Sequence, residues 1–208
     1  LALPAGYVIA RAALRWRRLL LMLVIVPFWT SFLIRIFAWK VLLHPEGAIQ
    51  RTLAFLGLIA PDAILLYNPG AVLLVMVYTF LPFAILPIYA AAEKFDFTLT
   101  EAARDLGASR FQALIRVFVP GISRGLWTAA LVVFIPALGS YVIPDLVGGP
   151  GGEMIGNKIV QRVFVDRNVP HAAALSALLM LAVLAPTLGV LALQARRRTP
   201  EAIIEEDA

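Results

Sequence analysis

Long apolar runs separated by short charged segments dominate the pattern of this 208-residue chain. The runs predict helical spans at residues 1–14, 19–43, 70–92, 126–147 and 171–193. A helix needs about 20 apolar residues to cross a hydrocarbon core of roughly 30 Å, and only the last four runs have this length. The first run is interrupted by Arg11 and opens on Leu1, so we expect N-terminal sequence to be missing. A cleaved signal peptide is disfavoured, because no basic segment or cleavage pattern precedes the run.

The composition agrees with several membrane spans. Hydrophobic residues make up 61% of the chain, charged residues 15%, and the mean hydropathy is +0.87. We therefore expect an all-α, polytopic membrane protein. The chain has no cysteine, and its two histidines, His44 and His171, are far apart in sequence, so we predict neither a disulfide framework nor a metal site.

The lysines and arginines between the spans predict the orientation in the membrane. Three basic clusters alternate with the spans: Arg11, Arg15, Arg17 and Arg18; Lys94, Arg104, Arg110, Arg116 and Arg124; and Arg196, Arg197 and Arg198. Crossing the predicted spans places all three clusters on one face, which the positive-inside rule makes cytoplasmic. The loops at 44–69 and 148–170 would then lie outside. Membrane insertion thus accounts for the pI of about 10.0, and nucleic-acid binding is not needed to explain it.

The stretch TLTEAARDLGASRFQALIRVFVP, residues 98–120, encodes two short helices in a loop. Thr98 precedes Glu101 by three residues, and Ser109 precedes Gln112 by three residues; each pair has the spacing of a capping box. Gly107 lies between the two predicted helices, where a left-handed residue often ends a helix.

The second of these helices carries an apolar stripe. It consists of Phe111, Leu114, Ile115 and Phe118, and we expect the helix to end before Pro120. From the residues alone, the pair is equally well an interfacial amphipathic hairpin that lies against lipid headgroups.

The same stretch resembles the cytoplasmic EAA loop of permease subunits of bacterial type I ABC importers. Glu101, Ala102, Ala103, Gly107 and Pro120 match the pattern of that loop as they stand. Val117 and Val119 replace its usual isoleucine and leucine, which keeps the apolar character. The resemblance implies a coupling helix that docks on an ATPase. It also implies the residues that couple: Glu101, Ala102, Ala103, Gly107, Phe111, Leu114 and Phe118. The alternative for part of the apolar stripe is packing against the chain's own helices.

Four further segments resemble the spermidine/putrescine (polyamine) subgroup of these permeases. They are VPFWTSFLIRIFAW, VYTFLPFAILPIYAAAEKFD, FIPALGSYVIPDLVGGP and MIGNKI. The resemblance runs from about residue 20 to 190 and implies six spans in the full chain, with both ends cytoplasmic. A permease domain would cover 1–195, with a coupling loop at 93–125, and a cytoplasmic tail 196–208.

This resemblance also implies the partners and the location. A multi-pass subunit of the bacterial inner membrane would pair with a second permease, two ATPase subunits and a periplasmic substrate-binding protein. The chain lacks a G-x-x-x-x-G-K-[ST] loop, so ATP and magnesium are expected to bind the partner ATPase and no cofactor is expected here. We therefore expect a transport subunit and not an enzyme.

Asp145 is the candidate for contact with a cationic cargo, because it follows a segment interrupted by prolines and glycine. Tyr141, Trp127 and Tyr78 could offer aromatic faces to an ammonium group. The alternatives are an interfacial Asp145, and aromatic side chains that serve the membrane belt or helix packing. Related permeases handle other solutes, so ferric iron, a phosphonate or an opine-like compound stays open as cargo. An intramembrane enzyme or a passive channel is disfavoured.

Two motifs and two cations have simpler interpretations. GISRG, residues 121–125, has the spacing of a hydrolase nucleophile elbow but follows no strand. VGGPGGEMIG, residues 147–156, is glycine-rich but has no following Gly-Lys, so it is interpreted as an outer turn. Arg35 and Lys40 are expected to extend toward the interface or to pair locally.

Overall fold

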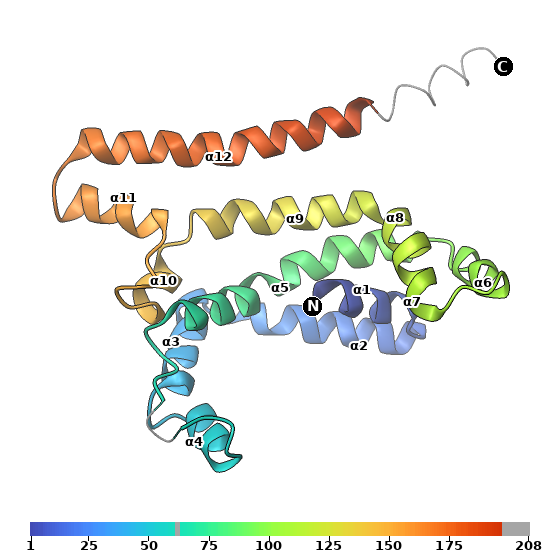
Figure 1. Cartoon of the computed structure of the whole chain (residues 1–208), viewed down its shortest axis with the longest axis horizontal. Helices are drawn as coiled ribbons and strands as arrows, with labels where there is room; N and C mark the ends of the chain where they lie inside the picture. Colours follow the sequence, from blue (N-terminus) through green and yellow to red (C-terminus); the bar gives the residue numbers. More distant parts are fainter. Residues whose placement is uncertain (61–62, 197–208) are drawn as a thin grey trace.

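Helix α5 (Pro69–Glu93) is the axis of the structure, and it confirms the span expected at 70–92. The computed structural model describes residues 1–60 and 63–196, which form helices and loops and, within those ranges, no β-strand (Figure 1). The Asn68 side chain caps α5 by accepting a hydrogen bond of 2.9 Å from the Ala71 N–H. Pro82 and Pro87 lie inside α5, and each removes one donor from the helical hydrogen-bond ladder.

Helices α1 (Ala2–Arg11) and α9 (Ser123–Leu138) pack along α5. Two glycines permit these contacts, because a Cβ atom at Gly6 would collide with Ile88 and one at Gly125 would collide with Ala91. Small residues let helix backbones approach closely in lipid, where apolar side chains gain little from association alone. The close packing of α1 and α9 on α5 therefore requires a residue without a side chain at both positions.

The span expected at 19–43 is wrong as one continuous helix. Helix α2 (Leu14–Ile25) continues into a 3₁₀ turn, η1 (Val26–Trp29), and the chain then bends by 93° before α3 (Phe32–Leu43). Pro27 has no N–H for the ladder, and the Thr30 hydroxyl donates to the Pro27 carbonyl at 2.7 Å. Helix α4 (Ala48–Phe55) follows α3 and lies away from α5 (Figure 1).

The span expected at 126–147 is also interrupted. Helix α9 ends at Leu138, and α10 (Val142–Val147) is a separate short helix after the Gly139–Ser140 linker. Pro136 is accommodated inside α9, so the linker and not this proline marks the break. Helices α11 (Ile155–Phe164) and α12 (Val169–Arg196) then pair, and α12 also contacts α9. Helix α12 contains the span expected at 171–193.

Length and composition qualify two helical segments of the described chain as membrane spans, Pro69–Glu93 and Val169–Gly189. Two bent pairs raise the number to four: Leu14–Trp29 with Phe32–Phe55, and Arg110–Gly121 with Ser123–Leu138. Helix α1 has 10 residues, too few to cross a bilayer, so the expected span at 1–14 is not complete in this chain. Most of the expected tail, residues 197–208, lies outside the described residues.

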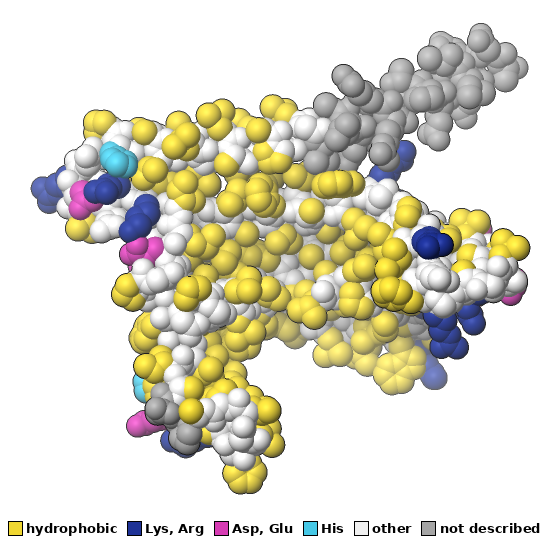
Figure 2. All heavy atoms as spheres, in the orientation of Figure 1, with side chains coloured by type: hydrophobic (Ala, Val, Ile, Leu, Met, Phe, Trp, Pro, Cys, Tyr) yellow, Lys and Arg dark blue, Asp and Glu magenta, His cyan; other side chains and the backbone are white. Residues whose placement is uncertain are grey.

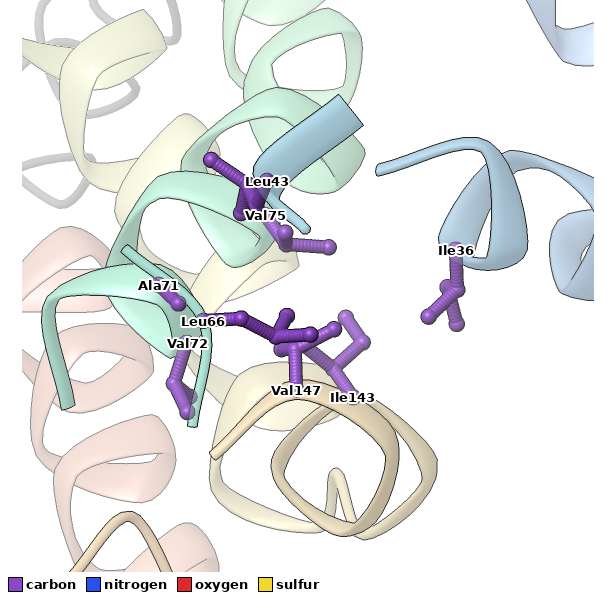
Figure 3. Close-up of a cluster of buried hydrophobic side chains, with 8 residues drawn as sticks. All are labelled: Ile36, Leu43, Leu66, Ala71, Val72, Val75, Ile143 and Val147. Carbon is purple, nitrogen blue, oxygen red and sulfur yellow. The ribbon is translucent and has the colours of Figure 1, made fainter. Parts of the chain in front are cut away.

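Two clusters of buried side chains hold the helices, one toward each end of α5. The outer cluster joins α3, α5, α10 and the loop before α5 (Figure 3), and consists of Ile36, Leu43, Leu66, Ala71, Val72, Val75, Ile143 and Val147. The inner cluster joins α1, α5, α9 and the coupling loop, and consists of Ala10, Ile88, Ala92, Phe118, Ile122 and Ala129. Both ends of α5 are thus fixed by separate sets of contacts.

Basic side chains lie at the end of the molecule that carries α6 (Thr98–Asp105) and α7 (Arg110–Ala113) and also near the turn between α11 and α12, while apolar side chains cover the helices between the two ends (Figure 2). Ion pairs tie this end together: Arg17 contacts Glu93 at 2.7 Å and Arg11 contacts Glu101 at 3.6 Å. The first two basic clusters of the sequence therefore share one end, as the predicted orientation requires.

Single-cysteine labelling tests that orientation. Leu106→Cys and Gly151→Cys lie in opposite end loops; Leu106 is 90% exposed, and a Cβ atom at Gly151 has open space. Because basic loops stay in the cytoplasm, an impermeant maleimide should label position 106 only from the cytoplasmic side and position 151 only from outside. The natural chain has no cysteine, so unlabelled parent protein is the control. Labelling of position 106 from outside would reverse the assigned topology.

Candidate functional site

The start of α6 differs from the expected capping box. Thr98 does not cap the helix and pairs instead with Asp96, whose Oδ1 accepts from the Thr98 N–H at 3.0 Å and from the Thr98 hydroxyl at 2.8 Å. The helix begins at Thr98, one residue earlier than the sequence pattern predicted, because Asp96 binds the first amide. Glu101 is therefore not engaged in a cap, and its carboxylate pairs with Arg11 of α1.

The same contacts change the pKa of the Asp96 carboxyl group. The Thr98 hydroxyl and the Thr98 backbone N–H donate to it and hold the pKa of this carboxyl below its usual value. Since the folded-state pKa is lowered, the contribution to stability is present above the ordinary pKa of aspartate and is lost as the pH falls through the folded value.

The turn between α6 and α7 confirms the role expected for Gly107. Its φ angle is +91°, in the region that favours glycine, and a Cβ atom there would meet nothing within 4 Å. The Gly107 N–H donates to the Arg104 carbonyl at 2.9 Å, and the Ala108 N–H donates to the Ala103 carbonyl at 3.0 Å. These bonds take up the carbonyls at the end of α6. The constraint at Gly107 is therefore conformational and not steric.

The capping box expected at Ser109 is confirmed. The Ser109 Oγ accepts from the Gln112 N–H at 3.2 Å, and the Gln112 Oε1 accepts from the Ser109 N–H at 2.9 Å. This reciprocal pair fixes the direction in which α7 leaves the turn.

The helix after Ser109 does not end before Pro120, which corrects the expectation. Helix α7 passes into a π-helical segment, η2 (Leu114–Phe118), and then into α8 (Val119–Gly121), which tolerates Pro120 in its first turn. Each residue of a π segment advances roughly 15–20° less than one of an α-helix, so five residues rotate the following side chains by roughly 90°. The expected single stripe is therefore divided.

Phe118 is the part of the stripe that turns inward. Its side chain is 0% exposed, whereas Phe111 is 69% and Ile115 48% exposed. The Phe118 ring lies 4.9 Å from the Tyr7 ring and 5.3 Å from the Phe95 ring, both edge to face. Of the two alternatives for the stripe, Phe118 follows the second: its buried side chain packs against the chain's own helices. Leu114 is partly buried in the same cluster.

The outward surface of the coupling loop carries small, apolar and charged side chains. Ala102, Leu106 and Phe111 are exposed, with Leu106 at 90%, and Ala103 is half-buried. Next to them lies a hollow of about 580 Å³ lined by Glu101, Arg104, Asp105, Ala108, Ser109 and Arg110. A surface with two exposed apolar side chains, Leu106 and Phe111, beside charges of both signs suits docking on another protein.

The residues expected to line a substrate path do not share one site. Tyr78 packs edge to face on Trp39 of α3 at 5.3 Å. Trp127 is 55% exposed near the N-terminus of α9, at the end of the molecule that carries α6 and α7. Tyr141, 44% exposed, lies at the other end, where its carbonyl accepts from the Asn157 side chain at 3.0 Å.

Asp145 lines a hollow at the outer end of the molecule. The hollow measures about 370 Å³ and is lined by Pro144, Asp145, Gly149, Pro150, Glu153, Asn157, Val160, Gln161 and Val165. Two carboxylates and two side-chain amides thus face one space, although Glu153 also pairs with Lys158. The sequence indicated Asp145 but not Glu153, which lies in the glycine-rich turn that we interpreted as purely structural.

The remaining motif residues have structural roles. A Cβ atom at Gly121 would collide with the Phe95 ring, so the glycines of GISRG serve close packing and not a nucleophile turn. In residues 1–60 and 63–196, there is no group of three His, Cys, Asp or Glu side chains that could hold a metal ion. Arg35 lies over the Phe28 ring at 4.2 Å and Lys40 over the Tyr67 ring at 5.7 Å, which are local partners as expected.

Comparison with known families decides what this loop belongs to. Residues 2–199 match the family described as "Binding-protein-dependent transport system inner membrane component". The chain belongs to this family. It is therefore an inner-membrane protein with an importer permease fold.

Individual relatives agree with the family. The chain is 40% identical over 176 residues to the spermidine/putrescine transport system permease protein PotB of Escherichia coli, covering 85% of this chain and 64% of PotB. It is 33% identical over 186 residues to the inner membrane ABC transporter permease protein YdcU of Escherichia coli, covering 84% of this chain and 59% of YdcU. The chain thus spans less than two thirds of the length of both relatives.

A solved structure shows the same fold. A chain in the crystal structure of a bacterial ABC transporter involved in the import of the acidic polysaccharide alginate superposes with a TM-score of 0.68. The match covers 93% of this chain and 72% of that chain at 19% identity. The helices of the two chains are therefore arranged alike at a low sequence identity.

Substitution of Gly107 tests the role of the turn between α6 and α7. Gly107→Val should reduce copurification of the ATPase and uptake together, because a β-branched residue with positive φ costs about 1–2 kcal/mol. Gly107→Asn is the matched control, since asparagine tolerates this region better. Uptake and ATPase copurification are measured in the same membranes. Equal uptake by the valine variant and the parent would contradict the need for a positive φ angle at Gly107.

Substitution of Asp96 tests the cap of α6. Asp96→Ala should speed hydrogen exchange of the first amides of α6, because the Thr98 N–H loses its acceptor. Asp105→Ala, at the other end of the same helix, should leave those amides unchanged. Because the folded-state pKa of Asp96 is lowered, the difference between variant and parent should be the same at about pH 5 and about pH 8. A difference that vanishes at the lower pH would contradict this assignment.

Proposed function

We propose that this chain is a membrane-spanning subunit of an ATP-driven importer that moves polyamines of the spermidine/putrescine type into the cytoplasm. The observation that carries the proposal is the 40% identity to PotB over 85% of this chain, together with membership of the permease family. Cargo would pass from a periplasmic binding protein to the membrane helices and cross by alternating access.

The coupling loop supports the energy-transfer part of the proposal. Two partner ATPases would bind ATP and magnesium, and the exposed face with Ala102, Leu106 and Phe111 would contact one of them. Motion at this face would reach the membrane through Phe118, because that side chain is buried against α1 and α5. A second permease, different in sequence, would complete the translocation path.

The outer hollow supports a cationic cargo. A polyamine carries two or more ammonium groups, and their dehydration must be offset by carboxylates, amide oxygens or aromatic faces. Asp145, Glu153, Asn157 and Gln161 supply such oxygens around one space at the end where the binding protein would dock. Glu153 also forms an ion pair with Lys158, so Asp145 would be the carboxylate with more capacity to bind an ammonium group.

Uptake by the assembled importer tests the cargo. Asp145→Asn combined with Glu153→Gln should lower uptake of labelled spermidine roughly tenfold at low concentration, because the amides still accept hydrogen bonds but lose the negative charge that strengthens each bond by roughly 0.7 kcal/mol. ATPase copurification should be unchanged. Glu46→Gln, which removes an exposed carboxylate in the loop between α3 and α4, is the control.

Two outcomes would separate the parts of this proposal. Undiminished spermidine uptake by the double variant would remove the outer hollow from the path. A parent importer that takes up no polyamine, although its own binding protein is present, would refute the cargo and leave the family membership intact.

A further inference from the structure

A hollow lies between α1 and the two helices of the coupling loop. It measures about 750 Å³, and its lining comes from α1, α6, α7 and the first residue of η2. It is separate from the outer hollow of Asp145. The transport mechanism proposed above gives it no role.

One end of this hollow is basic. Arg11, Arg104 and Arg110 contribute to its lining from three different helices. Arg11 is held in place: it donates to the Tyr7 hydroxyl at 3.0 Å and lies over the Phe97 ring at 5.4 Å. Glu101 offsets part of its charge at 3.6 Å. Arg104 and Arg110 are exposed.

The other end is apolar. Leu3, Pro4 and Val8 of α1 line it, and Val8 is 58% exposed. Leu3 precedes Arg11 by eight helical residues, so it lies roughly 12 Å farther along the axis of α1, at the 1.5 Å rise of a helix. With the basic cluster at the cytoplasmic headgroups, as the predicted orientation requires, Leu3 would lie at acyl-chain depth.

We propose that this hollow binds an anionic phospholipid of the cytoplasmic leaflet. The phosphate would lie among Arg11, Arg104 and Arg110, and an acyl chain would follow Leu3, Pro4 and Val8 along α1. Basic pockets at the cytoplasmic ends of membrane helices select anionic headgroups. A soluble ATPase could contact the arginines, but the apolar side chains at the other end suit an acyl chain. The bound lipid would contact α1 and the coupling loop together.

Photocrosslinking of the assembled importer tests the site. The complex with its full-length chain is reconstituted in phosphatidylcholine vesicles that contain a trace of phosphatidylglycerol with a diazirine in its acyl chain. Crosslinked peptides should map to α1 and α7. Each basic residue near an anionic surface is worth roughly fivefold in binding, so Arg104→Gln with Arg110→Gln should lower the crosslink on the order of twentyfold. The same diazirine on phosphatidylcholine should label α1 weakly.

Two further variants keep the test sharp. Arg116→Gln with Arg124→Gln removes the same charge from the coupling loop outside the hollow and should leave the crosslink unchanged. Val8→Trp fills the apolar end without changing charge and should also abolish the crosslink. Equal labelling by the two lipids would overturn the proposal. So would loss of ATPase copurification in Arg104→Gln with Arg110→Gln while phosphatidylglycerol labelling persists, because the arginines would then serve the ATPase.

Discussion

The burial of Phe118 among aromatic rings fixes the coupling loop to the membrane helices. Tyr7 comes from α1, Phe95 and Phe97 from the segment after α5, and all three rings contact Phe118 within 6 Å between centroids. Edge-to-face rings have a preferred geometry, which a purely aliphatic contact lacks. A displacement of the loop must therefore move α1 or α5, or break this cluster.

The local chemistry of the coupling loop could be predicted where a few neighbouring residues decide it. Gly107 and the Ser109–Gln112 pair need only their own turn, and both are as the sequence indicated. The Thr98 pattern failed because Asp96, two residues earlier, offers a charged acceptor that competes for the same amide. The π segment has no sequence signal that we recognised. Its inward turn places Phe118 in the aromatic cluster, and this contact involves residues more than 100 positions away in α1.

Prediction of the spans shows the same limit on a larger scale. Apolar runs identified α5 and α12 well, since both are continuous helices. The runs at 19–43 and 126–147 contain apolar residues on both sides of a break, so hydropathy cannot locate it. Of the path residues, only Asp145 lies in a hollow with a second carboxylate. That carboxylate is Glu153, and the turn at 148–154 and the contact between α10 and α11 bring it there.

The two prolines of α5 give this helix uneven stiffness. Its outer end is held by Ala71, Val72 and Val75 in one cluster and its inner end by Ile88 and Ala92 in another. Pro82 lies between these anchored ends, and Pro87 adjoins the inner one. A helix bends most easily where ladder hydrogen bonds are missing. A force applied at either end is therefore expected to bend α5 mainly near its middle, so that the two halves of the helix tilt relative to each other while each half stays straight.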